Sequence, residues 1–256
     1  MSGYKVLLAG ESWVSASSHV KGLDQFSTST YHTGADELLA ALKDGPLDVR
    51  FMPSHEAQSA FPQSLEAMRE YDAIVLSDIG ANTLLLHPDT WIKSKPTPNR
   101  LRLLRDYVRE GGALLMYGGY FSFQGINGGA RYHNTPVEEV LPVTCLPVDD
   151  RVEVPESFIP VITGSPNHPI LAGLGKDWPM LLGFNEVVLK DGAEVHATVS
   201  SDYRSLPLLV SGTYGKGRTV VWTSDVGPHW LPSEFIAWDG YKKLFEQQLL
   251  WAIGRD

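Results

Sequence analysis

The sequence predicts an α/β protein whose central sheet is mostly parallel and covered by helices on both faces. Continuous apolar runs alternate with helix-period segments in the first half, as buried parallel strands and their crossover helices do. The apolar run 113–117 leads into a Gly-rich turn at 118–119, where such sheets carry their ligand crevice. Of the 256 residues, 43% are hydrophobic and 20% charged, which is typical of a globular chain with a large core.

Apolar runs and their spacing predict the elements of the first half. Strands are expected at Val6–Ala9, Val49–Met52, Ala73–Leu76 and Ala113–Tyr117, with helices near 35–42, 63–70 and 100–109 between them. The last helix has the clearest pattern, because Leu101, Leu104 and Val108 recur at helical spacing. Gly111 follows this helix and is expected to help end it.

The second half departs from this alternation. Seven prolines between Pro142 and Pro179 exclude helices and central strands, so edge strands and loops are expected there. We therefore predict a single domain, 1–256, with a Pro-rich insertion at about 141–190. A short helix is expected at 136–140, strands at 194–199, 207–211 and 218–223 with a hairpin turn at 215–217, and a last helix capped by Asp239.

Composition excludes several classes of protein. The net charge of -9 and the lack of a Lys/Arg block argue against a nucleic-acid surface. Tyr4–Ala9 is too short for the core of a signal peptide, and no apolar run reaches the roughly 20 residues of a membrane helix. The single cysteine, Cys145, has no intramolecular disulfide partner, so a reducing, cytoplasmic location is expected.

The strand order, the turn after Met116 and the segment Ser224–Trp230 together resemble the class I glutamine amidotransferase-like family. Residues 71–82 and 235–241 match as well, so the resemblance covers nearly the whole chain. It implies a flavodoxin-like three-layer sandwich. Working glutaminases of this class carry Gly-x-Cys-x-Gly at the turn, which we call the elbow, and a His-x-Glu pair about a hundred residues later.

This chain departs from that motif at the nucleophile. Tyr120 stands in the cysteine position, Ser122 where the second glycine falls, and Gln124 where the family often has glutamine. A phenol with an ordinary pKa of about 10 is a poor substitute for a thiolate. Glutaminase activity is therefore not expected, and whether the protein is an enzyme stays open.

Four residues are candidates for catalysis. His229 lies near the position of the class's catalytic histidine, and Asp225 is placed to orient its ring. Ser122 or Tyr120 would then act as nucleophile in a hydrolase or amidotransferase. The alternatives are structural: His229 bonded within a Pro-Trp turn, and Tyr120 packed over the floor of the crevice.

A second set of residues follows the predicted strands and is expected to bind a ligand. Because the crevice lies beyond the carboxyl ends of the strands, polar residues after each strand should converge there. These residues are Glu11, Ser12, Asp78, Asn82, Gly118, Gly119 and Gln124. Local capping and turn formation are the alternative roles of Ser12, Asp78 and Asn82.

No metal or cofactor is expected, because the eight histidines form no His-x-x-x-His pair and 125–129 lacks the Lys-Ser/Thr of a phosphate loop. Three hypotheses for function remain. The chain binds a small polar metabolite in the crevice without glutaminase activity, or it is a hydrolase using Ser122 or Tyr120 with His229, or it is a non-enzymatic scaffold. A homo-oligomer is expected, and neither nucleic acid nor membrane is expected as a partner.

Overall fold

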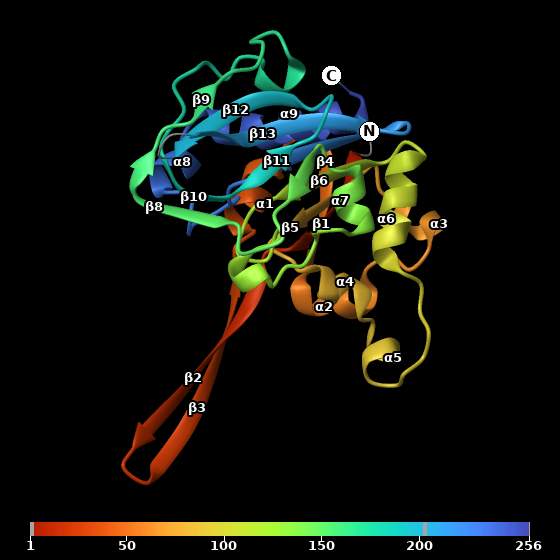
Figure 1. The fold of residues 1–256 in the computed structure, drawn as a ribbon, viewed down its shortest axis with the longest axis vertical. Helices are drawn as coiled ribbons and strands as arrows, with labels where there is room; N and C mark the ends of the chain where they lie inside the picture. Colours follow the sequence, from red (N-terminus) through yellow and green to blue (C-terminus); the bar gives the residue numbers. More distant parts are fainter. Residues whose placement is uncertain (1–2, 202–203, 256) are drawn as a thin grey trace.

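The computed structural model describes residues 3–201 and 204–255. Within them, a central sheet combines β1 (Tyr4–Gly10), β4 (Leu47–Pro53), β5 (Ala73–Ser77), β6 (Ala113–Tyr117), β9 (Val161–Ile162), β12 (Glu194–Ser201), β13 (Arg204–Tyr214) and β14 (Gly217–Trp222). Their order is β4-β1-β5-β6-β14-β13-β12-β9 (Figure 1). The strands from β4 to β14 are parallel, whereas β13, β12 and β9 add antiparallel. The predicted α/β class with a mostly parallel sheet is confirmed.

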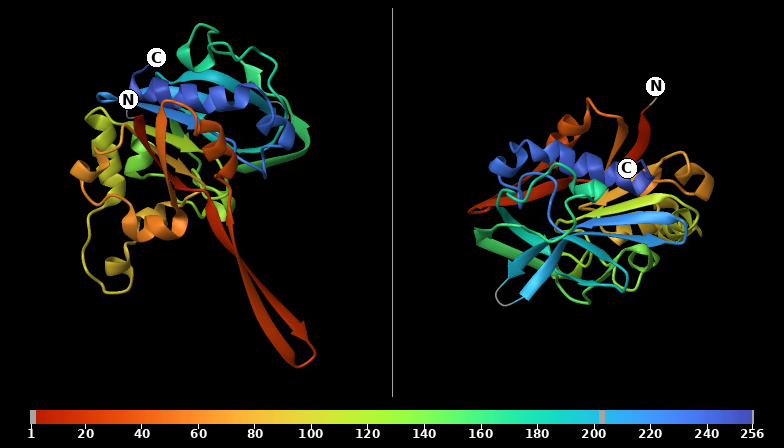
Figure 2. Two further views of the ribbon diagram at one scale, coloured as in Figure 1. Left: turned by 180° about the vertical axis from the view of Figure 1, so that it is seen from behind. Right: turned by 90° about the horizontal axis from the view of Figure 1, so that it is seen from above.

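Two apolar cores lie on opposite faces of this sheet. Alternation along β1 sends Val6 and Leu8 into one core and Leu7 and Ala9 into the other. Helices α1 (Asp36–Leu42) and α9 (Gly240–Ile253) pack on the first core, and Figure 2 shows α9 lying along that face. The second core is covered by α2 (Ser54–Ala60), α3 (Leu65–Met68), α4 (Ala81–Leu85), α6 (Arg100–Arg109) and α7 (Pro136–Val140).

Most predicted elements are confirmed, whereas the helix predicted over 63–70 and the predicted cap at Asp239 differ. α6 and α7 begin and end at the predicted residues. The helix predicted over 63–70 is only one turn, α3, because the chain must turn at Tyr71 to enter β5. α2, α4 and α5 (Pro88–Trp91) were not expected from the sequence. Asp239 precedes α9 but its side chain makes no capping hydrogen bond, so its predicted capping role is wrong.

The Pro-rich region forms short antiparallel pairs that brace the elbow. β10 (Leu181–Asn185) pairs with β8 (Arg151–Phe158), and β11 (Val187–Leu189) pairs with β7 (Val143–Cys145). Asn185 accepts a hydrogen bond from the Gly119 N–H at 3.0 Å and donates one to its carbonyl at 3.2 Å. Asp150 accepts the backbone N–H groups of Gln124 and Gly125. The Pro-rich region therefore fixes the turn that follows β6.

A long hairpin was missed by the sequence-based prediction. β2 (Ser12–Lys21) and β3 (Asp24–Thr33) pair antiparallel over ten residue pairs, and we call residues 12–33 the arm. The arm projects away from the rest of the molecule (Figures 1 and 2). Its base is held by α2, where the Ser54 N–H donates to Ser12 Oγ at 2.8 Å and the ring of His55 meets Tyr31 edge-on.

Candidate functional site

A cavity of about 480 Å³ opens beyond the carboxyl ends of the parallel strands. It is lined by Glu11, Trp13, Val14, Gly34, Asp78, Tyr120, Phe121, Asp225, Gly227, Pro228 and His229. These residues follow β1, β5, β6 and β14 or belong to the base of the arm. The cavity therefore collects polar groups from four neighbouring strands of one sheet.

The elbow after β6 places Tyr120 at this cavity. The Gly118 N–H donates to the carbonyls of Trp222 and Ser224, which holds the turn against the end of β14. Gly119 has a φ of +137°, and a Cβ there would lie 2.8 Å from Asp78 Oδ1. Only glycine suits this position, so the chain reaches the cavity at Tyr120. Tyr120 Oη donates to Glu153 at 2.7 Å, and burial together with Glu153 raises the pKa of the phenol.

Three carboxyl groups share the cavity wall. Burial, followed by the neighbouring Asp225 and Asp78, raises the pKa of Glu11 well above its usual value. Burial and Asp225 likewise raise the pKa of Asp78 to about 6, although its Oδ1 accepts the Phe121 N–H at 2.7 Å. Burial also raises the pKa of Asp225. These carboxyls hold protons more tightly than free ones, as groups suited to acid–base chemistry or ligand binding do.

His229 forms a close pair with one of these acids. Its Nδ1 lies 3.0 Å from Asp225 Oδ2, and its Nε2 lies 3.8 Å from Glu153 Oε1. The bond to Asp225 is the main cause that raises the pKa of His229. The rings of Tyr120 and His229 meet edge-on with centroids 4.4 Å apart. Asp225, His229 and Tyr120 line the cavity, and Glu153, outside the lining, links His229 to Tyr120.

The backbone at the site is unusually strained. The backbone φ values of Glu11, Asp78 and His229 are +45°, +44° and +137°. Residues other than glycine rarely adopt such positive values. Such conformations cost of order 1–3 kcal/mol each and persist where the surrounding structure enforces them. The three residues are therefore held in place at the expense of stability, a pattern typical of functional sites.

We expect the pKa of His229 to fall in an Asp225→Asn variant, because the carboxylate that stabilises its imidazolium is removed. Ring resonances of ¹³C-labelled histidine, followed by NMR between pH 5 and 9, measure this midpoint. The histidines outside the cavity serve as internal controls. An unchanged titration midpoint of His229 would mean that Asp225 does not stabilise the protonated ring.

Several predicted site residues lie away from the cavity. Ser122 is buried, donates to the Tyr117 carbonyl and accepts the Asp78 N–H at 3.1 Å, so it braces the elbow. Ser12 anchors α2, and Asn82 lies exposed within α4. Gln124 accepts the His133 N–H, and Gly118 holds the turn itself. The structure brings together Glu11, Asp78, Tyr120, Asp225 and His229, with Gly119 shaping their approach.

Sequence reasoning missed part of the cavity wall and the acid that contacts it from behind. Glu153, which accepts the Tyr120 hydroxyl, comes from β8 in the Pro-rich region, whose position across the sheet has no local pattern. Val14, from the arm, and Phe121, beside the elbow, add apolar surface. Phe121 directly follows Tyr120 at the predicted elbow, so its place near the cavity could have been predicted from the sequence. Val14 could not, because it belongs to the arm, which the sequence did not predict.

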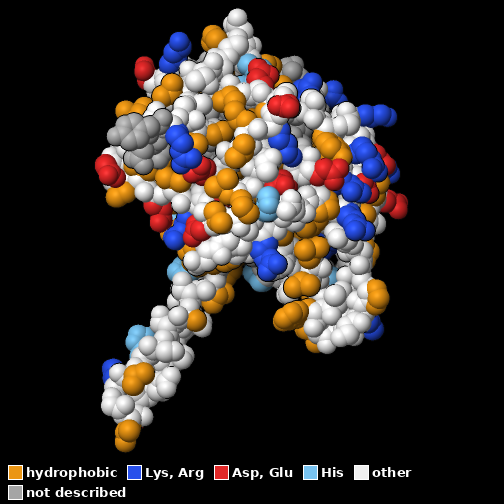
Figure 3. Space-filling view, viewed as in Figure 1, with side chains coloured by type: hydrophobic (Ala, Val, Ile, Leu, Met, Phe, Trp, Pro, Cys, Tyr) orange, Lys and Arg blue, Asp and Glu red, His pale blue; other side chains and the backbone are white. Residues whose placement is uncertain are grey.

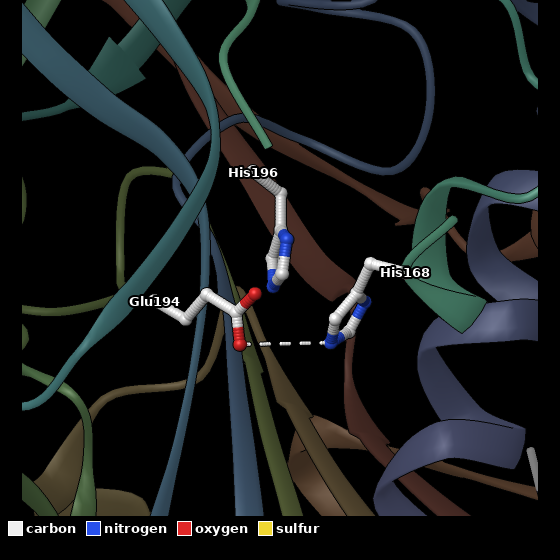
Figure 4. Close-up of side chains that lie close together, drawn as sticks. All are labelled: His168, Glu194 and His196. Carbon is white, nitrogen blue, oxygen red and sulfur yellow. Dashed lines mark ion pairs between the residues drawn. The ribbon is translucent and has the colours of Figure 1, made fainter. Parts of the chain in front are cut away.

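A second cluster lies at the far part of the sheet. His168, Glu194 and His196 have potential ligand atoms within 4.8 Å of one another. His168 Nε2 and Glu194 Oε2 lie 3.7 Å apart and form an ion pair, drawn as a dashed line in Figure 4. His168 Nδ1 accepts the Ile170 N–H, which leaves its proton on Nε2, facing Glu194. His196 Nε2 bonds Ser211 at 2.8 Å. Because this bonding pattern does not leave His168 Nε2 free as a ligand, we assign no metal to the cluster.

The parallel sheet, the Gly-Gly elbow and the polar groups around it are features of the glutamine amidotransferase-like class. Residues 5–253 match the family model described as "Putative glutamine amidotransferase". The chain belongs to this family. A search of curated protein sequences finds no match. Among the described residues, no helix has the length and apolar character needed to cross a membrane.

Two solved structures from Salmonella are similar along nearly their whole length. Cytoplasmic Protein STM3548 from Salmonella typhimurium is 44% identical, with a TM-score of 0.91, covering 96% of this chain and 98% of that one. Cytoplasmic Protein STM1381 from Salmonella typhimurium LT2 is 46% identical, with a TM-score of 0.91 and coverage of 97% and 99%. A structure described as a "Putative thua-like protein" from Parabacteroides merdae ATCC 43184 shares the fold at 14% identity, with a TM-score of 0.60 and coverage of 98% and 90%.

Proposed function

We propose that this protein binds a small polar metabolite in the elbow cavity and does not hydrolyse glutamine. The observation that carries the proposal is the convergence of Glu11, Asp78, Asp225 and His229 on one cavity. The cavity volume is within the range of small-molecule sites. Convergent polar groups with shifted pKa values are typical of binding and catalytic sites.

The wall composition indicates the chemistry of the ligand. Glu11, Asp78 and Asp225 offer carboxyl oxygens that accept hydrogen bonds, while Trp13 and Phe121 offer apolar surface. A ligand with several hydroxyl or amino groups on a compact carbon frame satisfies both. An anionic ligand would face three acids and is disfavoured.

The residues around the elbow support the lack of glutaminase activity. Tyr120 has a raised pKa and donates its proton to Glu153, so it is a weak nucleophile. Ser122 is engaged with backbone groups. Cys145 is buried on β7, and burial raises the pKa of its thiol well above the usual value. None of these side chains offers the activated nucleophile that amide hydrolysis needs.

A second candidate function is favoured by the His229 and Asp225 pair. An imidazole 3.0 Å from a buried carboxylate can transfer protons to a bound ligand. In this case the ligand would be a substrate, and His229 would act as general acid or base without a covalent step.

We also propose that the fold is a flavodoxin-like three-layer sandwich, which the cores on both faces of the sheet support. A cytoplasmic location is proposed as well, and the names of the two Salmonella relatives support it.

A thermal-shift panel of polyols, amino sugars, sugar acids and glutamine tests the proposed binding. We expect neutral or cationic members to raise the melting temperature. Asp225→Asn should weaken binding of the best compound about tenfold, because one hydrogen bond to a charged group is lost. Titration calorimetry measures the affinity.

Asp191→Asn provides the matched control, since Asp191 is exposed and outside the cavity. Binding should be unchanged in this variant. Ammonia release from glutamine that disappears in His229→Gln would contradict the proposal and favour an amidotransferase. A panel in which no compound binds would favour the scaffold hypothesis.

A further inference from the structure

Most of the arm takes no part in the cavity. Only Trp13 and Val14, at its base, line the cavity wall. Its strands run for ten residue pairs without a register shift, and nearly all their side chains are exposed. A strand rises about 3.4 Å per residue, so the arm is about 34 Å long. Six of its large apolar residues are exposed: Trp13, Val14, Val20, Leu23, Phe26 and Tyr31.

This apolar surface is concentrated at the two ends of the arm. Val20, Leu23 and Phe26 surround the tip, and Trp13, Val14 and Tyr31 surround the base. Between them, residues 15–18 pair with residues 27–30, and all are Ser, Thr or Ala. Figure 3 shows the resulting pattern, with apolar side chains at the tip and toward the base of the projecting arm.

An isolated two-stranded ribbon is marginally stable in water, so the arm is expected to need a covering surface. Exposed strand edges are normally protected by charged residues, proline or bulges. The arm has none of these between Ser12 and Val20 or between Gln25 and Thr33, and its charged residues are Lys21 and Asp24 at the tip. Its edges are thus open to pairing with another strand.

We propose that the arm pairs with the arm of a second copy of this chain, antiparallel and about a two-fold axis. This arrangement sets the apolar tip of each arm beside the apolar base of the other, and the small residues of both arms meet at the centre. An interface related by a two-fold axis must be self-complementary, and the two-ended pattern meets that condition.

Size and charge both favour a second copy as the occupant. The arm contains 22 residues, counted from Ser12 to Thr33, and standard interfaces use about 20–30 residues a side. Lys21 and Asp24 cancel, so the arm carries no net charge although the chain carries -9. Two arms therefore meet without the repulsion that the acidic bodies would produce.

The pairing also bears on the cavity. Trp13 and Val14 belong to both the arm base and the cavity wall. The tip of the second arm, with Leu23 fully exposed at its end, would arrive beside these two residues. Each copy would then complete the mouth of the other copy's cavity.

Sedimentation of the full-length protein across a concentration series tests the pairing. We expect a dimer, and we expect Val20→Lys to weaken dimerisation at least about tenfold, because lysine is a natural edge-blocking residue. Ile92→Lys is the matched control, since Ile92 is equally exposed but lies next to α5. A monomer at all concentrations, or equal effects of the two variants, would overturn the proposal.

Distances between spin labels test the direction of pairing. The native Cys145 is buried, so a cysteine introduced at Ser17 or Leu23 can be labelled selectively. Antiparallel arms should give a short distance between Ser17→Cys labels near the centre, and about 34 Å between Leu23→Cys labels at opposite ends. A short distance between the tips would overturn the antiparallel arrangement.

Discussion

Gly119→Ala is expected to destabilise the protein by about 3 kcal/mol and to abolish ligand binding in the elbow cavity. The φ of +137° is strained for any residue with a Cβ, which costs of order 1–3 kcal/mol. The added methyl group would also lie 2.8–3.0 Å from three atoms of the Asp78 side chain. Asp78 is fixed by its bond to the Phe121 N–H, so it cannot move without breaking that bond.

Thermal unfolding provides the measurement, with a decrease of about 6–12 °C expected for a chain of this size. Gly175→Ala is the control, because Gly175 also has a positive φ, +69°, but has nothing within 4 Å of the added Cβ. It should cost only about 1 kcal/mol. If the two variants have the same melting temperature and Gly119→Ala still binds ligand, the close packing of the elbow on Asp78 is needed neither for stability nor for binding.

Asp78→Asn is expected to act in the opposite direction on stability. The folded-state pKa of about 6 exceeds the ordinary value of 3.8, so the folded protein binds a proton more tightly than the unfolded chain does. Stability from this group is complete below pH 3.8 and is lost as the pH rises through about 6. Asparagine removes this penalty and retains an oxygen for the Phe121 N–H. We expect a gain of about 2 kcal/mol at pH 8.

Chemical denaturation of both proteins at pH 4 and pH 8 measures the effect. The gain should be present at pH 8 and nearly absent at pH 4, while ligand binding is lost at both. Asp191→Asn should change neither quantity, because Asp191 is exposed and remote from the cavity. A gain of equal size at both pH values would show that the charge on Asp78 carries no penalty.

Local pattern was sufficient to predict the buried elements. β5 and β6 are continuous apolar runs, and α6 carries Leu101, Leu104 and Val108 on one face, so burial itself determines each pattern. The arm could not be found in this way. Both its faces are exposed, so Ser, Thr and Ala stand where a half-buried strand would alternate apolar and polar residues.

The candidate site was predictable only in part for a similar reason. Glu11, Asp78, Tyr120 and His229 follow strand ends, and the carboxyl ends of parallel strands necessarily meet. Asn82 follows the same strand as Asp78, but the chain has already entered α4 and left the cavity. Glu153 comes from the Pro-rich region, whose position depends on tertiary contacts such as Asn185 with Gly119.

The tyrosine at the elbow and the burial of Cys145 also bear on how this protein reacts with oxidants. An enzyme that depends on a cysteine thiolate is inactivated by oxidants such as peroxide, which attack the sulfur. Tyr120 offers these reagents no sulfur, and the buried Cys145 thiol resists them because burial raises its pKa. The cavity is therefore expected to present no thiol that peroxide can oxidise.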